Sequence, residues 1–319
     1  MPDAPKLISI IVPCLNEEQN VGRCYEAVTT VFEGLPGYDF ELIYVDDGST
    51  DGTEKAIRKL IDADRRCCLI VNARNFGVYR SSFHALKYVN GDAVMPMLPV
   101  DLQDPPELIP EFVRLWEEGN LVVAGVRYER DEPWLMRGIR RTYYRVASRL
   151  ADFDLPKYVG EYQLLDRSIA TQLTQIDDYY PYTRGLIASL SNRRATIPYV
   201  WQKREVGKSN MNLWKLIDQG LNGIVSTSTA PLRLVSILGL AVALFAFTFG
   251  IVQLIAHFTF ASSITDPGIS TIILLVSFFA AVNAVCFGVV AEYLGAVHAQ
   301  VRGRWRVVER ERVNLGDPQ

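Results

Sequence analysis

Residues 40–51 read Phe-Glu-Leu-Ile-Tyr-Val-Asp-Asp-Gly-Ser-Thr-Asp, an apolar run that ends in a dense acidic turn. The run has the length of a buried strand, and the Asp and Gly residues after it are typical of turns. A segment with helical periodicity follows at Gly52–Arg65. The stretch therefore predicts one strand and helix unit of an α/β sheet, with carboxylates at the carboxyl end of the strand.

The same unit recurs along the first part of the chain. Strand-like apolar runs lie at Leu7–Val12, Phe40–Val45, Cys67–Val71, Ala93–Leu98 and Leu121–Val126. Helical patterns lie between them at Glu17–Phe32, Gly52–Arg65, Val78–Val89 and Pro106–Glu118. This alternation predicts an α/β fold, a mostly parallel sheet with helices on both faces.

Polar residues follow three of these strands directly. They are Asn16 and Glu17, then Asp46 and Asp47, then Asp101, Gln103 and Asp104. One acidic turn alone is more often a helix cap or an Asx-turn, but ligands of such sheets bind beyond the carboxyl ends of the strands. Hard oxygen ligands of this kind suit Mg²⁺ or Mn²⁺ beside a diphosphate. For Asp104, ahead of Pro105, capping of the next helix is favoured over a role as general base.

Composition excludes several classes of protein. The 319 residues are 49% apolar with a net charge of -3, so the basic excess of a nucleic-acid binder is missing and no nucleic-acid partner is expected. Five cysteines without a C-x-x-C pair and three scattered histidines indicate neither a disulfide framework nor a zinc site. The apolar run Leu7–Val12 is too short for the core of a signal peptide and has no cleavage site after it, so the first domain is expected to stay in the cytosol.

Two charge-free stretches near the C-terminal end, Leu234–Thr265 and Ile269–Ala291, are long enough to cross a bilayer as a hairpin. Their length and continuous apolarity disfavour the alternative of two buried core helices. Arg233 precedes the pair and several Arg residues follow it, whereas the connecting loop has no Lys or Arg. The positive-inside rule therefore predicts that both termini of this integral membrane protein are cytoplasmic. The membrane we expect is the bacterial inner membrane.

These features divide the chain into four parts. We expect a cytoplasmic catalytic domain over 1–210, an interfacial amphipathic helix over 211–231, two transmembrane helices over 232–297 and a cytoplasmic basic tail over 298–319. For the segment before the first span, periodicity fits equally well a helix packed on the soluble domain. Small residues in the spans would also permit a homo-oligomer.

Basic residues offer a second kind of site. From residue 134 to 150 arginines recur at steps of four, which makes a slanting stripe on a helix. Such a stripe can be a solvated face, but beside a membrane it suits anionic headgroups and phosphate, which guanidinium groups bind well. The candidates for binding a phosphate, which in a transferase would be the acceptor phosphate, are Arg127, Arg137, Arg141, Arg204 and Lys208.

The order of the motifs resembles family 2 glycosyltransferases of the GT-A fold, specifically the dolichol-phosphate-mannose-synthase-like and bacterial polyprenyl-phosphate glycosyltransferases. The resemblance covers essentially the whole chain. It rests on Ile11-Val12-Pro13 with Asn16-Glu17-Glu18, on 45–51, on Arg74-Asn75-Phe76-Gly77, on 101–107, on 204–209 and on the C-terminal spans.

The resemblance implies a Rossmann-like nucleotide-binding sheet and assigns residues to it. The nucleotide-sugar positions it implies, with their strand-end neighbours, are Pro13, Leu15, Asn16, Glu17, Val45, Asp46, Asp47 and Asp101. Asp101 and Gln103 resemble metal ligands, and Asp101, Asp104 and Arg204 are the candidate catalytic residues. Three positions depart from the family: Pro99 replaces the first Asp of its Asp-x-Asp motif, Gln163 replaces a common Arg, and Asn210 a common Lys.

The function so implied is inverting transfer of a sugar from a nucleotide-sugar, similar to UDP-glucose or GDP-mannose, to a polyisoprenyl phosphate such as undecaprenyl phosphate. The product would serve modification of cell-envelope glycans. A processive polysaccharide synthase is disfavoured because its Gln-x-x-Arg-Trp motif and further spans are missing. The alternative from another class is a catalytically weak membrane scaffold or binding protein that keeps the fold, for which Pro99 is the main support.

Overall fold

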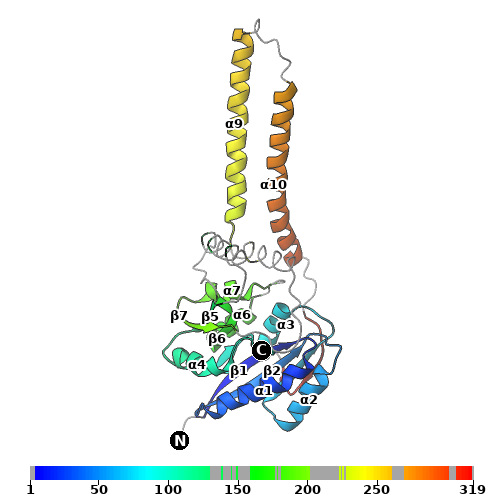
Figure 1. The fold of residues 1–319 in the computed structure, drawn as a ribbon, viewed down its shortest axis with the longest axis vertical. Helices are drawn as coiled ribbons and strands as arrows, with labels where there is room; N and C mark the ends of the chain where they lie inside the picture. The colour runs from blue at the N-terminus through cyan, green and yellow to red at the C-terminus, as the bar shows by residue number, and fades with distance from the viewer. Residues whose placement is uncertain are drawn as a thin grey trace.

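The computed structural model describes residues 4–129, 159–176, 181–201, 228–260, 269–301 and 307–317, with the single positions 138, 145, 149, 178, 223 and 225. Figure 1 shows an α/β domain from which two long helices project side by side. The interfacial helix expected over 211–231 falls almost wholly outside the described residues.

The α/β domain is built on one sheet of eight strands in the order β7-β5-β6-β4-β1-β2-β3-β8. Their bounds are β1 Lys6–Cys14, β2 Tyr38–Asp46, β3 Cys67–Asn72, β4 Ala93–Met95, β5 Val122–Glu129, β6 Val159–Asp166, β7 Arg194–Val200 and β8 Glu309–Val313. Strand β1 pairs in parallel with β2 and β4, β2 with β3, and β5 with β7; the three pairs that join β6 and β8 to the sheet are antiparallel. The mostly parallel sheet is confirmed.

Helices cover both faces of this sheet, as predicted. One core cluster joins inward side chains of the central strands, such as Ile10, to α1 Glu18–Glu33, α2 Thr53–Ala63 and α4 Ile109–Glu117. The other joins the opposite side chains, such as Ile11, to α3 Val78–Ala85, η1 Leu86–Tyr88, α6 Arg167–Thr174 and α7 Thr183–Leu190. Strands buried on both faces have continuous apolar runs, which is why the first three were predicted closely.

Two predicted elements need correction. The fourth strand was expected over Ala93–Leu98 but ends at Met95, because Pro96 has no N–H to donate to the ladder. The helix expected over Val78–Val89 ends at Ala85 and continues as the tighter η1 turn.

The last strand was not predicted. Strand β8 lies after the second long helix, yet it pairs antiparallel with β3 at the edge of the sheet. Its residues lie in the stretch expected to be a cytoplasmic basic tail over 298–319, an expectation that came from the arginines after the second apolar stretch. The structure places them in the α/β domain.

The two long helices are α9 Ala230–Phe260 and α10 Ile269–Val301. Both contain a window long and apolar enough to cross a membrane, Ala230–Val252 and Leu275–Val301, and neither window is buried among the residues that the structure describes. The hydroxyl of Tyr293 on α10 donates to the carbonyl of Ser228, just ahead of α9, at 2.7 Å. This hydrogen bond therefore connects α10 directly to the residues that lead into α9.

Candidate functional site

The loops after β1 and β2 are bound to each other at the carboxyl edge of the sheet. Asn16, with a left-handed φ of 57°, accepts from the backbone N–H of Thr50 at 2.8 Å through its side-chain oxygen. Its own N–H donates to the Ser49 hydroxyl at 2.9 Å. The backbone N–H of Glu17 donates to the Thr53 hydroxyl at 2.8 Å, and Asp46 accepts from the N–H of Ser49 at 2.9 Å. The two predicted nucleotide-binding turns thus form one unit.

Asp47 is the centre of the neighbouring contacts. Its Oδ1 accepts from the Asn72 amide at 2.8 Å, the Phe76 N–H at 2.9 Å and the Ser81 hydroxyl at 2.7 Å. Its Oδ2 accepts from the Gly77 N–H at 2.8 Å. The side chain is buried, and a buried carboxylate needs such donors. Asp47 therefore holds the segment after β3, here called the 73–77 loop (Ala73–Gly77), against the end of β2.

Gly48 allows this loop to approach. Its φ is 81°, and a Cβ there would lie 2.9 Å from Arg74 C and from Asn75 N. Only glycine fits a left-handed position in such close contact with another backbone. Of the other predicted nucleotide positions, Pro13 and Leu15 are half-buried at the end of β1, and Val45 is fully buried in the core.

The predicted metal ligands lie together on a turn that follows β4. The N–H of Leu102 donates to the Pro99 carbonyl at 3.1 Å, and Leu102 has a left-handed φ of 56°. The N–H of Gln103 donates to the Asp101 carboxylate at 3.3 Å. Asp101 and Gln103 are both partly exposed, so their oxygens are on one accessible turn.

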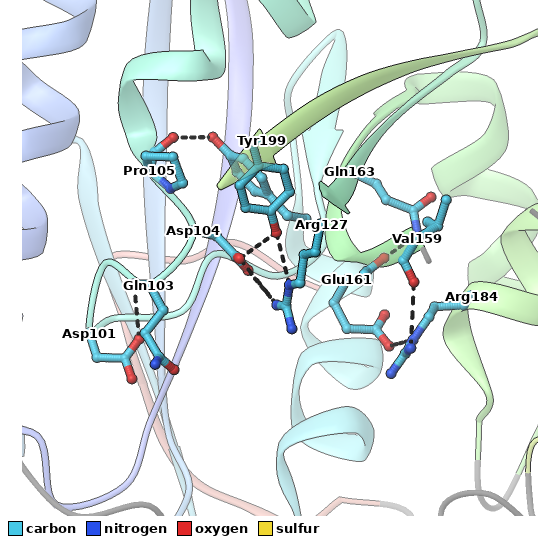
Figure 2. Close-up of polar contacts among 12 residues, drawn as sticks. Asp101, Gln103, Asp104, Pro105, Arg127, Val159, Glu161, Gln163, Arg184 and Tyr199 are labelled. Carbon is cyan, nitrogen blue, oxygen red and sulfur yellow. Dashed lines mark hydrogen bonds and ion pairs between the residues drawn. The ribbon is translucent and has the colours of Figure 1, made fainter. Parts of the chain in front are cut away.

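Asp104 does not cap a helix, which corrects the prediction. The next helical turn, η2 Pro106–Leu108, has Pro105 at its N-cap and no side-chain cap hydrogen bond. The Asp104 side chain is instead completely buried and accepts from Arg127 Nη2 at 3.1 and 3.0 Å and from the Tyr199 hydroxyl at 2.5 Å. Figure 2 shows this cluster beside the Asp101 turn.

The cluster raises the pKa values of Arg127 and Tyr199. Burial lowers the pKa of Arg127, but the charge of Asp104 and the contact with Tyr199 outweigh burial, so the pKa lies above its usual value. Burial, and then the charge of Asp104, raise the pKa of Tyr199, which stays protonated. Tyr199 accepts from Arg127 Nε at 3.0 Å, so Arg127 is a guanidinium held in one orientation.

A second ion pair, which was not predicted from the sequence, borders the first. Arg184 Nε donates to Glu161 at 2.6 Å, with both side chains mostly buried. Gly160, next to Glu161, would bring a Cβ to 3.3 Å from Arg127 Nε. In Figure 2 the charged ends of Glu161 and Arg184 point toward each other, and the Arg127 guanidinium lies beside them. A Glu inside an apolar strand, as in 159–165, was the signal available from sequence.

Four of the five proposed acceptor-phosphate residues, Arg137, Arg141, Arg204 and Lys208, lie outside the described residues. Arg127 is the one that the structure describes. Gln163, at a position where the family often has Arg, is buried and donates to the Gly160 carbonyl at 2.9 Å. Within the described part of the chain, no group of three or more His, Cys, Asp or Glu is arranged to hold a metal.

Comparison with known proteins adds to this geometry. Residues 9–174 match the family described as Glycosyl transferase family 2. An uncharacterized glycosyltransferase of Synechocystis is 30% identical over 298 residues, 93% of this chain and 92% of that protein. A bactoprenol glucosyl transferase of Shigella phage SfX is 30% identical over 306 residues, 96% of this chain and 99% of that protein.

Two further proteins are similar to this chain. A prophage bactoprenol glucosyl transferase homolog of Escherichia coli is 30% identical over 93% of this chain and 96% of its own length. Among solved structures, a mannosyltransferase from Pyrobaculum calidifontis in complex with GDP-Man and Mn²⁺ is 19% identical, with a TM-score of 0.49 over 95% of this chain and 88% of that chain.

Proposed function

The chain belongs to glycosyl transferase family 2, and on that premise we propose that it transfers glucose from a uridine nucleotide-sugar to a polyisoprenyl phosphate such as undecaprenyl phosphate. It is a glycosyltransferase by family, and the proposal adds its donor and acceptor. Relatives named for bactoprenol and glucosyl transfer support the choice because they match nearly the full length of the chain.

The observation that carries the proposal is the carboxylate edge of the sheet. The loops with Asn16 and Asp47 and the turn with Asp101 all follow the carboxyl ends of parallel strands, where α/β sheets bind nucleotides. We assign the first two loops to the nucleoside and the Asp101 turn to the diphosphate.

The donor chemistry of the Asp101 turn fits a divalent cation. Mg²⁺ is commonly held by one or two carboxylates together with substrate phosphates and water. The Asp101 carboxylate and the amide oxygen of Gln103 would therefore be sufficient as the ligands from the protein. Asp104 does not contribute, because its carboxylate is engaged by Arg127 and Tyr199. The bound cation, Mg²⁺ or Mn²⁺, would offset the charge of the diphosphate. Pro99 leaves the family's first Asp position without a ligand.

The reaction we propose is a single in-line displacement. An oxygen of the acceptor phosphate bonds to the anomeric carbon while the bond from that carbon to the nucleoside diphosphate breaks, so the configuration inverts. The acceptor is already an anion, which makes positioning and charge stabilisation the main tasks of the protein. Arg127, fixed by Asp104 and Tyr199, is assigned to orient a phosphate, with Arg204, Arg137, Arg141 and Lys208 as further candidates.

The two apolar helices are assigned to the membrane. A polyisoprenyl acceptor lies in a bilayer, and no part of the chain that the structure describes covers the apolar windows of α9 and α10. Arg233 and the arginines after α10 support an orientation with the catalytic domain and both termini in the cytoplasm.

Transfer of radiolabelled sugar tests the proposal directly. The full chain in detergent is given a panel of UDP- and GDP-sugars with undecaprenyl phosphate, in Mg²⁺, Mn²⁺ or EDTA. Labelled lipid from UDP-glucose with added metal is expected. Labelled lipid from another donor would replace the sugar in the proposal. If no donor gives labelled lipid while a control enzyme is active, the scaffold alternative is favoured.

A further inference from the structure

The C-terminal strand β8 reaches the rim of the candidate nucleoside site from the far end of the chain. We infer that β8 is a positioning element that holds the 73–77 loop, and with it Asp47, in the form that binds the nucleoside. The inference rests on the proposed function, because it concerns the donor site assigned there.

The backbone provides the first contact. The N–H of Ala73, the first residue of the 73–77 loop, donates to the Val308 carbonyl at 2.8 Å. The β3–β8 register shifts between Val71 and Asn72, which pair with Glu311 and Glu309, so Arg310 is an extra residue in β8. Such a bulge turns neighbouring side chains toward different sides of the strand.

Glu309 provides the second contact, beyond the other end of the loop. Its Oε1 lies 2.5 Å from His84 Nε2 on α3 and accepts from the Tyr88 hydroxyl on η1 at 2.5 Å. Arg312 lies 3.1 Å from the other Glu309 oxygen. The Glu309 side chain is only 15% exposed. Helix α3 begins at Val78, directly after the loop, so β8 holds the chain both before and after it.

The loop between these two attachments is the one that engages Asp47. Phe76, Gly77 and Ser81 all donate to the Asp47 carboxylate. Ser81 and His84 are on the same short helix. A continuous set of packed contacts therefore runs from Glu309 through α3 to Asp47.

The other side of β8 supplies a control. Arg310 pairs with Glu54, and Glu311 pairs with Arg58 at 2.6 Å, both on α2 and away from the loop. The Glu311 side chain is 46% exposed. Loss of this pair removes a carboxylate from the same strand without touching α3, and exposed pairs contribute little to stability.

The test measures nucleotide binding by the full chain in detergent, with UDP and GDP as probes and calorimetry as readout. Glu309→Ala is expected to raise the dissociation constant of the bound nucleotide about tenfold, equal to about 1.4 kcal/mol. Glu309→Gln, whose amide oxygen still accepts from His84 and Tyr88, and Glu311→Ala are expected to stay within about twofold of wild type. Thermal unfolding of each variant confirms that binding is measured on folded protein.

Equal dissociation constants for wild type, Glu309→Ala and Glu311→Ala would overturn the inference while leaving the proposed function intact. If Glu309→Ala does not fold, the double variant with Glu309→Gln and His84→Ala takes its place. Nucleotide binding by this double variant as tight as that of wild type also overturns the inference. A wild-type chain that binds neither nucleotide would contradict the proposed function itself, and the inference with it.

Discussion

Arg127 and Asp104 form a buried ion pair in which one guanidinium nitrogen lies 3.1 and 3.0 Å from the two carboxylate oxygens. The pair joins strand β5 to the turn that carries Asp101, and Tyr199 on β7 donates to the same carboxylate. One cluster thus fixes the turn that we assign to the diphosphate against strands β5 and β7.

Replacement of Asp104 by Ala is expected to destabilise the protein by about 3–5 kcal/mol, because it leaves the Arg127 guanidinium buried without its counter-charge. Tyr199→Phe removes one hydroxyl from the same cluster and should cost about 1–3 kcal/mol. Chemical unfolding in detergent measures both. An Asp104→Ala protein as stable as wild type would show that Arg127 finds another partner.

Gly48→Ala should weaken nucleotide binding and lower stability by more than Gly37→Ala. Both positions have a left-handed φ, 81° at Gly48 and 88° at Gly37. A Cβ at Gly48 would meet the backbone of Arg74 and Asn75, whereas a Cβ at Gly37 would have no heavy atom within 4 Å. The backbone strain alone costs about 1–2 kcal/mol. Binding of UDP and thermal unfolding separate the two effects, and indistinguishable variants would argue against close packing of the loops.

Asp101→Asn should reduce metal-dependent turnover at least about a hundredfold, since loss of a charged ligand weakens both the metal and the charge it offsets. The Mn²⁺ concentration for half-maximal activity should rise as well. Asp62→Asn, an exposed carboxylate on α2, is the matched control and should behave as wild type. Unchanged metal-dependent turnover in Asp101→Asn would refute the metal assignment.

Asp64 predicts a defined dependence of stability on pH. Hydrogen bonds from Arg66 lower the pKa of Asp64 to about 2, against the opposing effect of burial. The folded pKa is below the unfolded value near 3.9, so the carboxylate stabilises the fold above about pH 4 and loses its effect as the pH falls toward 2. The stability gap between wild type and Asp64→Asn should be about 2 kcal/mol at pH 7 and shrink by pH 3. A gap that does not change with pH would contradict this account.

The parts of the fold that could be predicted are those whose pattern lies within one short stretch of sequence. The runs that became β1, β2 and β3 are buried on both faces, and their apolar continuity is visible in the sequence alone. Asp46 and Asp47 could likewise be placed at a strand end by counting residues. What Asp47 binds could not be derived, because its donors come from a loop about thirty positions away.

The rest of the site depends on long-range pairing. Asp104 preceded two prolines and looked like a cap, and only the fold brings Tyr199 to it from 95 positions away. The Glu161–Arg184 pair was missed for the same reason. Strand β8 has charged residues at most positions, so its β character comes from pairing with β3 rather than from its own sequence.

The return of β8 also sets an order of events during synthesis. Glu309 follows His84 by 225 positions, and both long apolar helices are translated between them. Until β8 has been translated after those helices, β3 remains an open edge with unpaired backbone groups. Other strands can join an edge of this kind. The α/β domain is therefore the first to be translated and the last to be completed. A chain that ends before β8 exposes the edge of β3.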